Sequence, residues 1–467
     1  MQTTTHGLRS ELKLRDLVLM QVLLVVGLNL MGYASKQGPS QLVLWLLAIS
    51  LFYLPLAAVV MKLSRAIPVE GGVYQWVKEG ISPFAGYMAG WSFTVWVVAY
   101  FASFGSQLAN GIAYAFGSSA AWIAASKSFA VTLTILICLL AFALNVLGLK
   151  VAKWLSGVGS LFTIATFLIL LYLLMRALLT RRSAAGGSFS LAWPAFSLLT
   201  LNVFTKMALF ALSGLDQCAI FSEECRKPKN DVARSVLLAA PLIALIYILG
   251  TISIIAYVDP ANVDVAAPVS QVMQAGFGVT DVGRASTAIA VAGLSIALIA
   301  SLVVVVGMVS RLPMAAGWDG LLPEWWSVLH PKFRTPSKAI GAVTASLMLM
   351  GVLSLLGAGN QEAVQVLSSA GFGSYCIMYL LLFGQIVFGF RSHVWRPGLG
   401  IRLGALAAFM VVLVSMVFEF VPLGEVVSHA RFAMKVGGTM CATTGLGAFL
   451  YWSGTRRQRR IAEASGC

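Results

Sequence analysis

The sequence contains a series of apolar runs that are each long enough to cross a lipid bilayer. A membrane-spanning helix needs about 20 residues of low polarity. We place twelve such runs at about 17–35, 42–62, 84–116, 129–148, 154–175, 200–222, 236–258, 285–310, 338–357, 363–390, 403–421 and 432–453. Because backbone N–H and C=O groups must be paired in lipid, we expect an all-α polytopic membrane protein with twelve transmembrane helices.

The charge of the chain supports this fold class and sets its topology. Only 10% of residues are charged, whereas a soluble domain has about 25%. The net charge of +15 arises in short loops between apolar runs, which argues against a nucleic-acid partner. If the N-terminus is inside, most Lys and Arg residues fall in inner loops. We therefore predict a protein of the cell (inner) membrane with both termini cytoplasmic.

The distribution of cysteine and histidine gives no sign of a metal centre or a disulfide framework. The six cysteines form no C-x-x-C pair, and the four histidines are scattered outside the apolar cores. No grouping of His, Asp, Glu and Ser in the spans has hydrolase or metal-ligand spacing. We expect neither a cofactor nor an enzyme activity.

The sixth apolar run is interrupted. Lys206 and Asp216 both lie in it, and only nine uncharged residues separate them. Ser213-Gly214 stands between them and breaks the helical pattern. Ionisable groups and Gly at this depth are tolerated where a discontinuous helix lines a polar cavity. We therefore expect a broken sixth helix at the functional site.

The first apolar run carries a similar interruption, in which Asn29 lies between Gly27 and Gly32. Gly also serves as a packing residue in membrane helices, so this feature alone is ambiguous. However, the first and sixth runs are five helices apart. Interruptions at corresponding positions of two halves indicate an inverted repeat with the site at its interface.

This pattern predicts one transporter domain at 17–453, which consists of three parts and is flanked by two terminal segments. We expect a cytoplasmic segment at 1–16, one repeat at about 17–175, a second at about 200–390, two peripheral helices at about 403–453, and a basic, disordered cytoplasmic tail at 454–467.

Three stretches carry motifs of a known family. The first reads Pro68-Val-Glu-Gly-Gly-Val-Tyr74. The second reads Phe210-Ala-Leu-Ser-Gly-Leu-Asp216 and continues to Pro228-Lys-Asn-Asp-Val-Ala-Arg234. The third contains Gly320-Leu-Leu-Pro323 and His330-Pro-Lys-Phe-Arg-Thr-Pro336. In this order on a twelve-span chain, they resemble the amino acid–polyamine–organocation (APC) superfamily over about residues 15–455. The resemblance implies a five-plus-five inverted repeat and alternating-access transport of amino acids or related amines.

Two features depart from the family. Its first helix usually has a Gly-Ser-Gly-like unwound motif, whereas this chain has Gly27-Leu-Asn-Leu-Met-Gly32. A different cradle for the substrate α-carboxylate keeps open a second reading, an exchanger of polyamines or of an amino acid for its decarboxylation product. The fifth span also has no mid-membrane Lys, so proton coupling through that residue is unsupported.

The resemblance and the two breaks together define a candidate substrate site. The unwound first helix would offer N–H groups and the sixth would offer carbonyl groups. Phe210 resembles the family's aromatic gate, although it could equally pack in the core. Asp216 could attract an ammonium group, carry a coupling proton or be a structural carboxylate. The predicted substrate-binding residues are Gly27, Asn29, Met31, Gly32, Tyr100, Phe101, Phe210, Ala211, Ser213, Gly214 and Asp216.

Two further intramembrane charges are expected to lie outside this constellation. Lys206 is ten residues before Asp216, about 15 Å along a continuous helix, so we expect no direct pair. We expect Lys206 to face the outer vestibule or to snorkel. Glu419, near the outer end of the eleventh span, is expected to have an interfacial role.

The leading hypothesis is a secondary active transporter of an amino acid or related amine. Its partners would be that substrate, the lipid bilayer and a proton as candidate coupling ion. A transporter-like nutrient sensor is a more distant alternative, because such a sensor usually adds a soluble domain and no loop or tail is long enough to fold alone.

Overall fold

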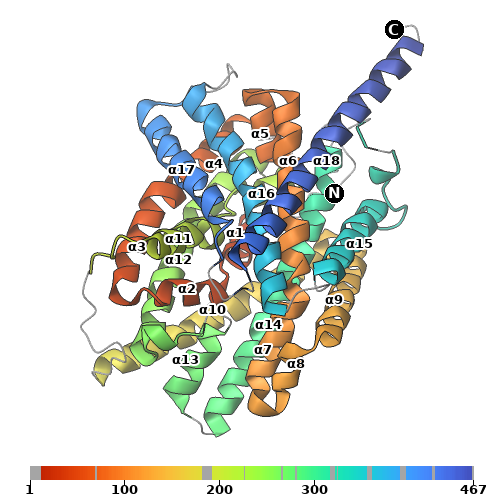
Figure 1. The fold of residues 1–467 in the computed structure, drawn as a ribbon. Helices are drawn as coiled ribbons and strands as arrows, with labels where there is room; N and C mark the ends of the chain where they lie inside the picture. The colour runs from red at the N-terminus through yellow and green to blue at the C-terminus, as the bar shows by residue number, and fades with distance from the viewer. Residues whose placement is uncertain are drawn as a thin grey trace.

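The computed structural model describes residues 12–68, 71–180, 192–225, 227–264, 267–278, 281–315, 321–322, 324–354, 360–389, 396–422, 426 and 428–464. Within these ranges the chain is a bundle of helices and contains no extended strand (Figure 1). Nine helices of the described part are long and apolar enough to cross a membrane. The predicted all-α polytopic fold is confirmed.

The long helices follow the predicted runs. They are α1 (Leu14–Val25), α4 (Leu54–Ala66), α6 (Pro83–Ala102), α7 (Phe104–Phe116), α9 (Lys127–Leu147), α10 (Leu149–Leu179), α12 (Pro228–Tyr257), α14 (Asp281–Ala315), α15 (Ser337–Ser354), α16 (Asn360–Phe388), α17 (Leu399–Phe418) and α18 (His429–Ala464). A short helix, α13 (Pro268–Phe277), lies between the seventh and eighth runs.

Shorter pieces complete the bundle and lie mainly at breaks and loops. They are η1 (Leu28–Leu30), α2 (Met31–Ser35), η2 (Gly38–Ser40), α3 (Gln41–Ala48), η3 (Ile49–Tyr53), α5 (Val73–Gly80), η4 (Gly117–Ala120), α8 (Ala121–Ala125), α11 (Leu198–Lys206), η5 (Met207–Ala211), η6 (Gln217–Glu224), η7 (Pro260–Asn262) and η8 (Glu324–Trp326).

The helix packing repeats after five spans. The two most extensive pairings are α6 with α16 and α10 with α14, which are the third span with the tenth and the fifth with the eighth. Adding five to the third span gives the eighth, and subtracting five from the tenth gives the fifth, so the first pairing maps onto the second. The pairings of α9 with α14 and of α6 with α15 are related in the same way. The contact pattern is therefore that of two equivalent five-helix units.

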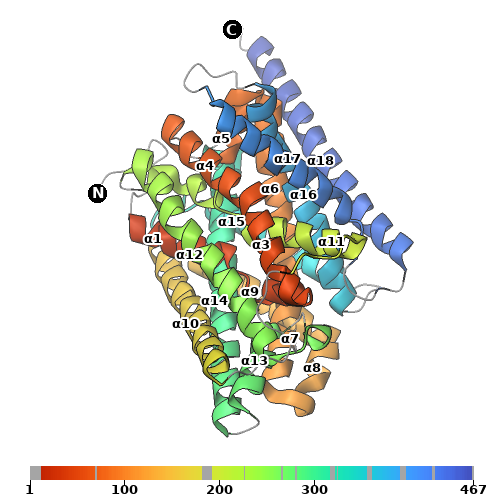
Figure 2. The same cartoon turned by 90° about the vertical axis from the view of Figure 1, so that its left-hand side faces the viewer.

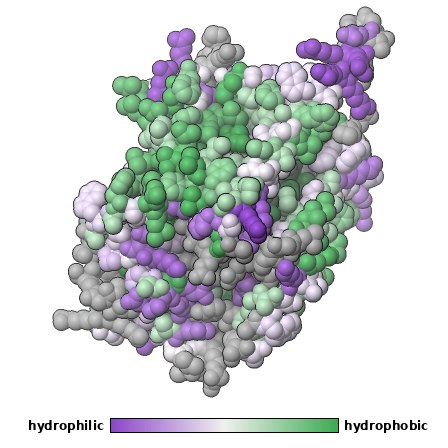
Figure 3. All heavy atoms as spheres, viewed as in Figure 1, coloured by the Kyte–Doolittle hydropathy of each residue, from purple (hydrophilic) through white to green (hydrophobic). Residues whose placement is uncertain are grey.

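The last two long helices lie outside this ten-span core. Helix α17 packs on α16 and α4, and α18 packs on α16 and α6. Both occupy the right-hand side of the bundle in Figure 2. The outward face of α17 exposes apolar side chains that suit a lipid environment, namely Leu403, Leu406, Met410 and Leu413, and apolar residues cover much of the upper half of the face in Figure 3.

The tail differs from the sequence-based expectation. Helix α18 continues to Ala464, so the prediction of disorder is wrong for 454–464. The sequence there contains four Arg and two Ala residues, and both residue types have high helix propensity. The end of this helix projects from the bundle and is hydrophilic (Figure 3).

Both predicted breaks are present. Helix α1 ends at Val25, and helical structure resumes in η1 and α2. In the sixth span, η5 ends at Ala211 and η6 begins at Gln217. Gly214, between them, has a φ of +110°, a conformation that glycine adopts without a steric penalty. The sequence signals for both interruptions are confirmed.

The loop after the second span packs directly on the sixth. Gly72 has a φ of +49°, and a Cβ atom there would lie 3.1 Å from the Ala219 side chain and 3.2 Å from the Ile220 nitrogen. Because a side chain at position 72 would crowd the sixth span, packing explains why this residue is a glycine. The rest of the motif at Val69 and Glu70 lies outside the described residues.

Candidate substrate-binding site

A tyrosine hydroxyl from an intact helix bridges each break. In α12, the Tyr247 hydroxyl accepts a hydrogen bond from the Gly27 N–H at 2.9 Å and donates to the Val25 carbonyl at 2.7 Å. In α16, the Tyr379 hydroxyl accepts from the Gly214 N–H at 3.0 Å and donates to Asp216 Oδ1 at 2.7 Å. Backbone groups that the breaks release from helical bonding are thus paired inside the protein.

The Tyr247 bridge predicts a stability difference between two Tyr→Phe variants. Tyr247→Phe removes the hydroxyl that bonds both groups and leaves only the 3.0 Å hydrogen bond from the Gly27 N–H to the Val25 carbonyl. We expect a loss of about 0.5–1.5 kcal/mol and a lower midpoint in thermal unfolding.

Tyr53 is a matched control, because its buried hydroxyl has no hydrogen-bond partner in the described part of the chain. Tyr53→Phe should leave the midpoint unchanged or raise it. Equal unfolding midpoints for the two variants would contradict a bonding role for Tyr247.

A cavity of about 380 Å³ lies beside the two breaks. Gly27 contributes to its wall from the first break, and Phe210 contributes from the residues just before the second. It extends to Asp264, before α13, and to Pro422, after α17, so it reaches the end of the bundle opposite the C-terminal end of α18 (Figure 1). Besides tyrosines and charged residues, the polar side chains in the wall are Gln107, Asn110, Thr163, Ser270, Ser295, Ser301, Gln365, Ser368 and Ser369.

The cavity brings together part of the predicted constellation. Gly27, Tyr100, Phe101 and Phe210 belong to its wall. Met31, Gly32, Ala211, Ser213, Gly214 and Asp216 do not belong to it. The side chain of Asn29 lies outside the described part of the structure. Substrate contact by any of these residues stays a prediction.

Phe210 belongs to an aromatic wall of the cavity. Its ring stacks on Phe372 of α16 with the centroids 3.6 Å apart, and Tyr100 of α6 meets the same Phe372 ring edge-on at 5.1 Å. A ring that packs on Phe372 and also belongs to the cavity wall fits a gate over a bound molecule. The gate role itself stays a prediction.

Asp216 lies on the other side of the second break. Its carboxylate is 2% exposed and holds the Tyr379 hydroxyl. The Tyr379 and Tyr375 hydroxyls are 3.1 Å apart, and Gln217 Nε2 donates to Tyr375 at 3.1 Å. This polar cluster fixes the segment after the break, so the geometry favours a structural carboxylate over a substrate ligand.

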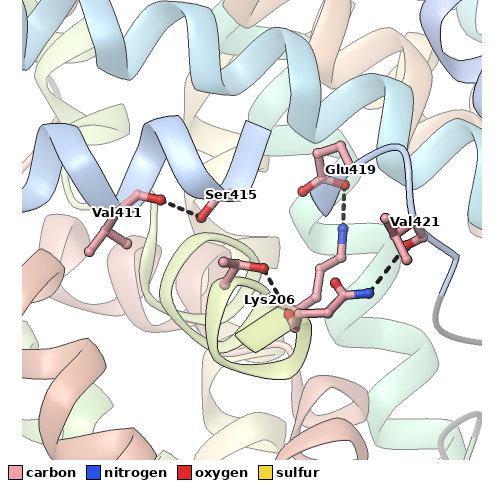
Figure 4. A network of polar contacts seen from close by, with 7 residues as sticks. Lys206, Val411, Ser415, Glu419 and Val421 are labelled. Carbon is pink, nitrogen blue, oxygen red and sulfur yellow. Dashed lines mark hydrogen bonds and ion pairs between the residues drawn. The ribbon is translucent and has the colours of Figure 1, made fainter. Parts of the chain in front are cut away.

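Lys206 and Glu419 form a buried ion pair that sequence reasoning missed. Lys206 is the last residue of α11 and is 4% exposed, and Glu419 directly follows α17 and is fully buried. Figure 4 shows the Lys206 ammonium directed at the Glu419 carboxylate. The sequence feature that could have revealed this pair is the presence of two opposite charges near the same end of their spans. The predicted snorkelling of Lys206 and the predicted interfacial role of Glu419 are therefore wrong, because each finds its partner inside the bundle. The alternative, that Lys206 faces an outer vestibule, stays a prediction, and Lys206 belongs to the cavity wall.

A second buried ion pair ties the end of the sixth span to the eighth. Arg311 of α14 pairs with Glu224 at the end of η6, with Nε and Oε1 2.7 Å apart, and both residues are buried. The Leu12 N–H donates to the Glu224 carbonyl at 3.0 Å. Lys153 of α10 and Asp16 of α1 pair at 3.5 Å. These contacts tie the two broken spans to the eighth and fifth.

The comparison with known proteins decides the family. A model of the family described as amino acid permease matches residues 12–441. The chain belongs to this amino acid permease family. The predicted resemblance is confirmed, and the family match together with the apolar helices identifies a multi-pass membrane protein.

Individual relatives are distant in sequence from this chain. An uncharacterised transporter of Mycobacterium tuberculosis (strain ATCC 25618 / H37Rv) is 27% identical over 290 residues, which cover 61% of each chain. The match thus spans less than two thirds of that relative.

Two other relatives carry named substrates. The branched-chain amino acid permease BcaP of Bacillus subtilis (strain 168) is 26% identical over 78% of this chain and 80% of its own. The probable agmatine/putrescine antiporter AguD of Lactococcus lactis subsp. lactis (strain IL1403) is 24% identical over 46% of this chain and 45% of its own.

Proposed function

We propose that this permease is a secondary active transporter that moves an amino acid or related amine by alternating access. The observation that carries the proposal is the cavity beside the two breaks, which reaches one end of the bundle, while the Arg311–Glu224 pair closes the other. A site between discontinuous helices with access from one side at a time is what this mechanism requires.

The cavity has a size and a lining that suit such a substrate. Its volume of about 380 Å³ lies within the range of small-molecule sites. Aromatic rings and small polar side chains share the wall, which suits an apolar group joined to a polar head. The name of BcaP supports an amino acid as the substrate.

Exchange of a polyamine, or of an amino acid for its decarboxylation product, is the second candidate. The name of AguD and the unusual first break, Gly27 to Gly32, both favour it. A proton remains the candidate coupling ion for symport. We place the protein in the cell membrane with both termini cytoplasmic, on the strength of the Lys and Arg distribution.

Uptake into liposomes tests these alternatives. Purified protein should accumulate a labelled L-amino acid or amine from a broad panel, since the site is present in the isolated chain. Uptake driven by a proton gradient would indicate symport, and uptake that needs internal counter-substrate would indicate exchange. Protein-free liposomes are the control, and a panel that gives no uptake under either condition would refute the transport proposal.

A further inference from the structure

Lys206 places a cation in the wall of the cavity. Among the described residues of that wall, the charged side chains are Lys206 and Asp264. Asp264 lies in the loop before α13, whereas Lys206 lies one helical turn before Phe210 in the sixth span. Its Nζ is 4.4 Å from the centroid of the Phe210 ring. The ammonium therefore sits on the ring that borders the cavity.

The glycine N–H groups at the two breaks are already occupied. Gly27 donates to Tyr247 and Gly214 donates to Tyr379. An incoming carboxylate would have to displace a tyrosine hydroxyl to use either of them. The Lys206 ammonium has three N–H donors. It donates to the Glu419 carboxylate, so it can also donate to a second anionic group.

The cavity wall also contains a region of partial negative charge, at the C-terminal end of α1. Helix α1 has twelve residues and ends at Val25, and Val26 and Gly27 line the cavity directly after it. The C-terminal end of a helix carries partial negative charge. An α-amino acid could thus direct its ammonium group toward the end of α1 and its carboxylate toward Lys206.

We propose that Lys206 is the carboxylate ligand of this site and that Glu419 is its counter-ion when no substrate is bound, so that the site selects α-amino acids over amines that lack a carboxylate. The proposal rests on the transport function and names its substrate class. The three N–H donors allow a substrate carboxylate to share the ammonium with Glu419, so neither buried ion loses its partner. Diamines would instead place a positive charge beside Lys206.

The test compares ligands that differ only in the carboxylate. Purified protein is titrated with each of the twenty L-amino acids, with their α-carboxamides and with the amines left by decarboxylation, and binding is read from the thermal shift. The wild type should bind at least one amino acid at least about tenfold more tightly than its carboxamide and its amine.

Variants then assign this preference to Lys206. Lys206→Met/Glu419→Gln removes both charges and leaves no unpaired buried ion. We expect it to lose about 10- to 100-fold in affinity for that amino acid, the range of one hydrogen bond to a charged group, with less than about threefold change for the carboxamide. Glu419→Gln keeps the ammonium and an acceptor for it, so amino acid affinity should stay within about threefold or improve.

A second ion pair supplies the matched control. Lys435 Nζ and Glu362 Oε1 lie 2.7 Å apart on α18 and α16, and neither residue lines the cavity. Lys435→Met/Glu362→Gln should leave both affinities unchanged.

The outcomes separate this proposal from the transport function. Equal losses for amino acid and carboxamide in the double variant, or a loss of amino acid binding in Glu419→Gln, would show a purely structural ion pair. A wild type that binds amines as tightly as amino acids would overturn the role of Lys206 and leave transport standing. A wild type that binds neither series and takes up neither would overturn both.

Discussion

Gly214→Leu should reduce transport at least about 100-fold while the protein still inserts into the membrane. Gly214 has a φ of +110°, which a leucine adopts only with strain. A Cβ atom there would also lie 3.0 Å from Gln217 Nε2 and 3.2 Å from Val25 Cγ2. Val25 ends α1, so the added side chain would push the two breaks apart at their point of contact. The measurement is initial uptake per reconstituted molecule.

Gly157 of α10 provides the control for this substitution. A Cβ atom at Gly157 meets no atom within 4 Å, so Gly157→Leu should keep transport within about threefold of the wild type. Both variants need equal surface expression and equal monodispersity in detergent. Normal uptake by Gly214→Leu would show that the conformation of the second break is not required for function.

Local signals in the sequence were sufficient to predict the broken helices. Gly27, Gly32 and Gly214 interrupt apolar runs at corresponding places in two halves, and the lipid environment restricts the remaining backbone to helices. The pairing of α6 with α16 and of α10 with α14 then follows from the same repeat. The repeated apolar runs and their two glycine-containing interruptions thus predicted the architecture and the places of the two breaks.

The contacts that complete the site were not predictable in the same way. Lys206 and Glu419 are 213 residues apart, and their meeting depends on how a peripheral helix packs against the core. The tyrosines that bridge the breaks are single apolar-compatible residues in intact helices, with no local feature that marks them. Asp216 drew attention because it is charged, but only the packing of α16 showed that Tyr379 holds it.

Arg311→Met should open the end of the pathway that the Arg311–Glu224 pair closes. The substitution removes the buried Arg311 cation from Glu224, and breaking a buried pair in this way costs about 3–5 kcal/mol. A state in which water reaches Glu224 avoids this cost, so its population rises. Cys218 lies in η6, is fully buried and points toward the Leu17 carbonyl. We expect its rate of modification by a water-soluble thiol reagent to rise at least about tenfold.

Two comparisons distinguish opening from general unfolding. Cys138 is also buried but lies in α9, on another part of the bundle, so selective opening should modify Cys218 and spare Cys138, as located by peptide mass. Lys435→Met breaks an ion pair on a different face and should leave Cys218 protected. Because Arg311→Met/Glu224→Gln leaves no bare buried charge, its Cys218 modification rate should fall back toward that of the wild type. Equal modification of both cysteines in Arg311→Met, or protection of both, would mean that this ion pair does not control access.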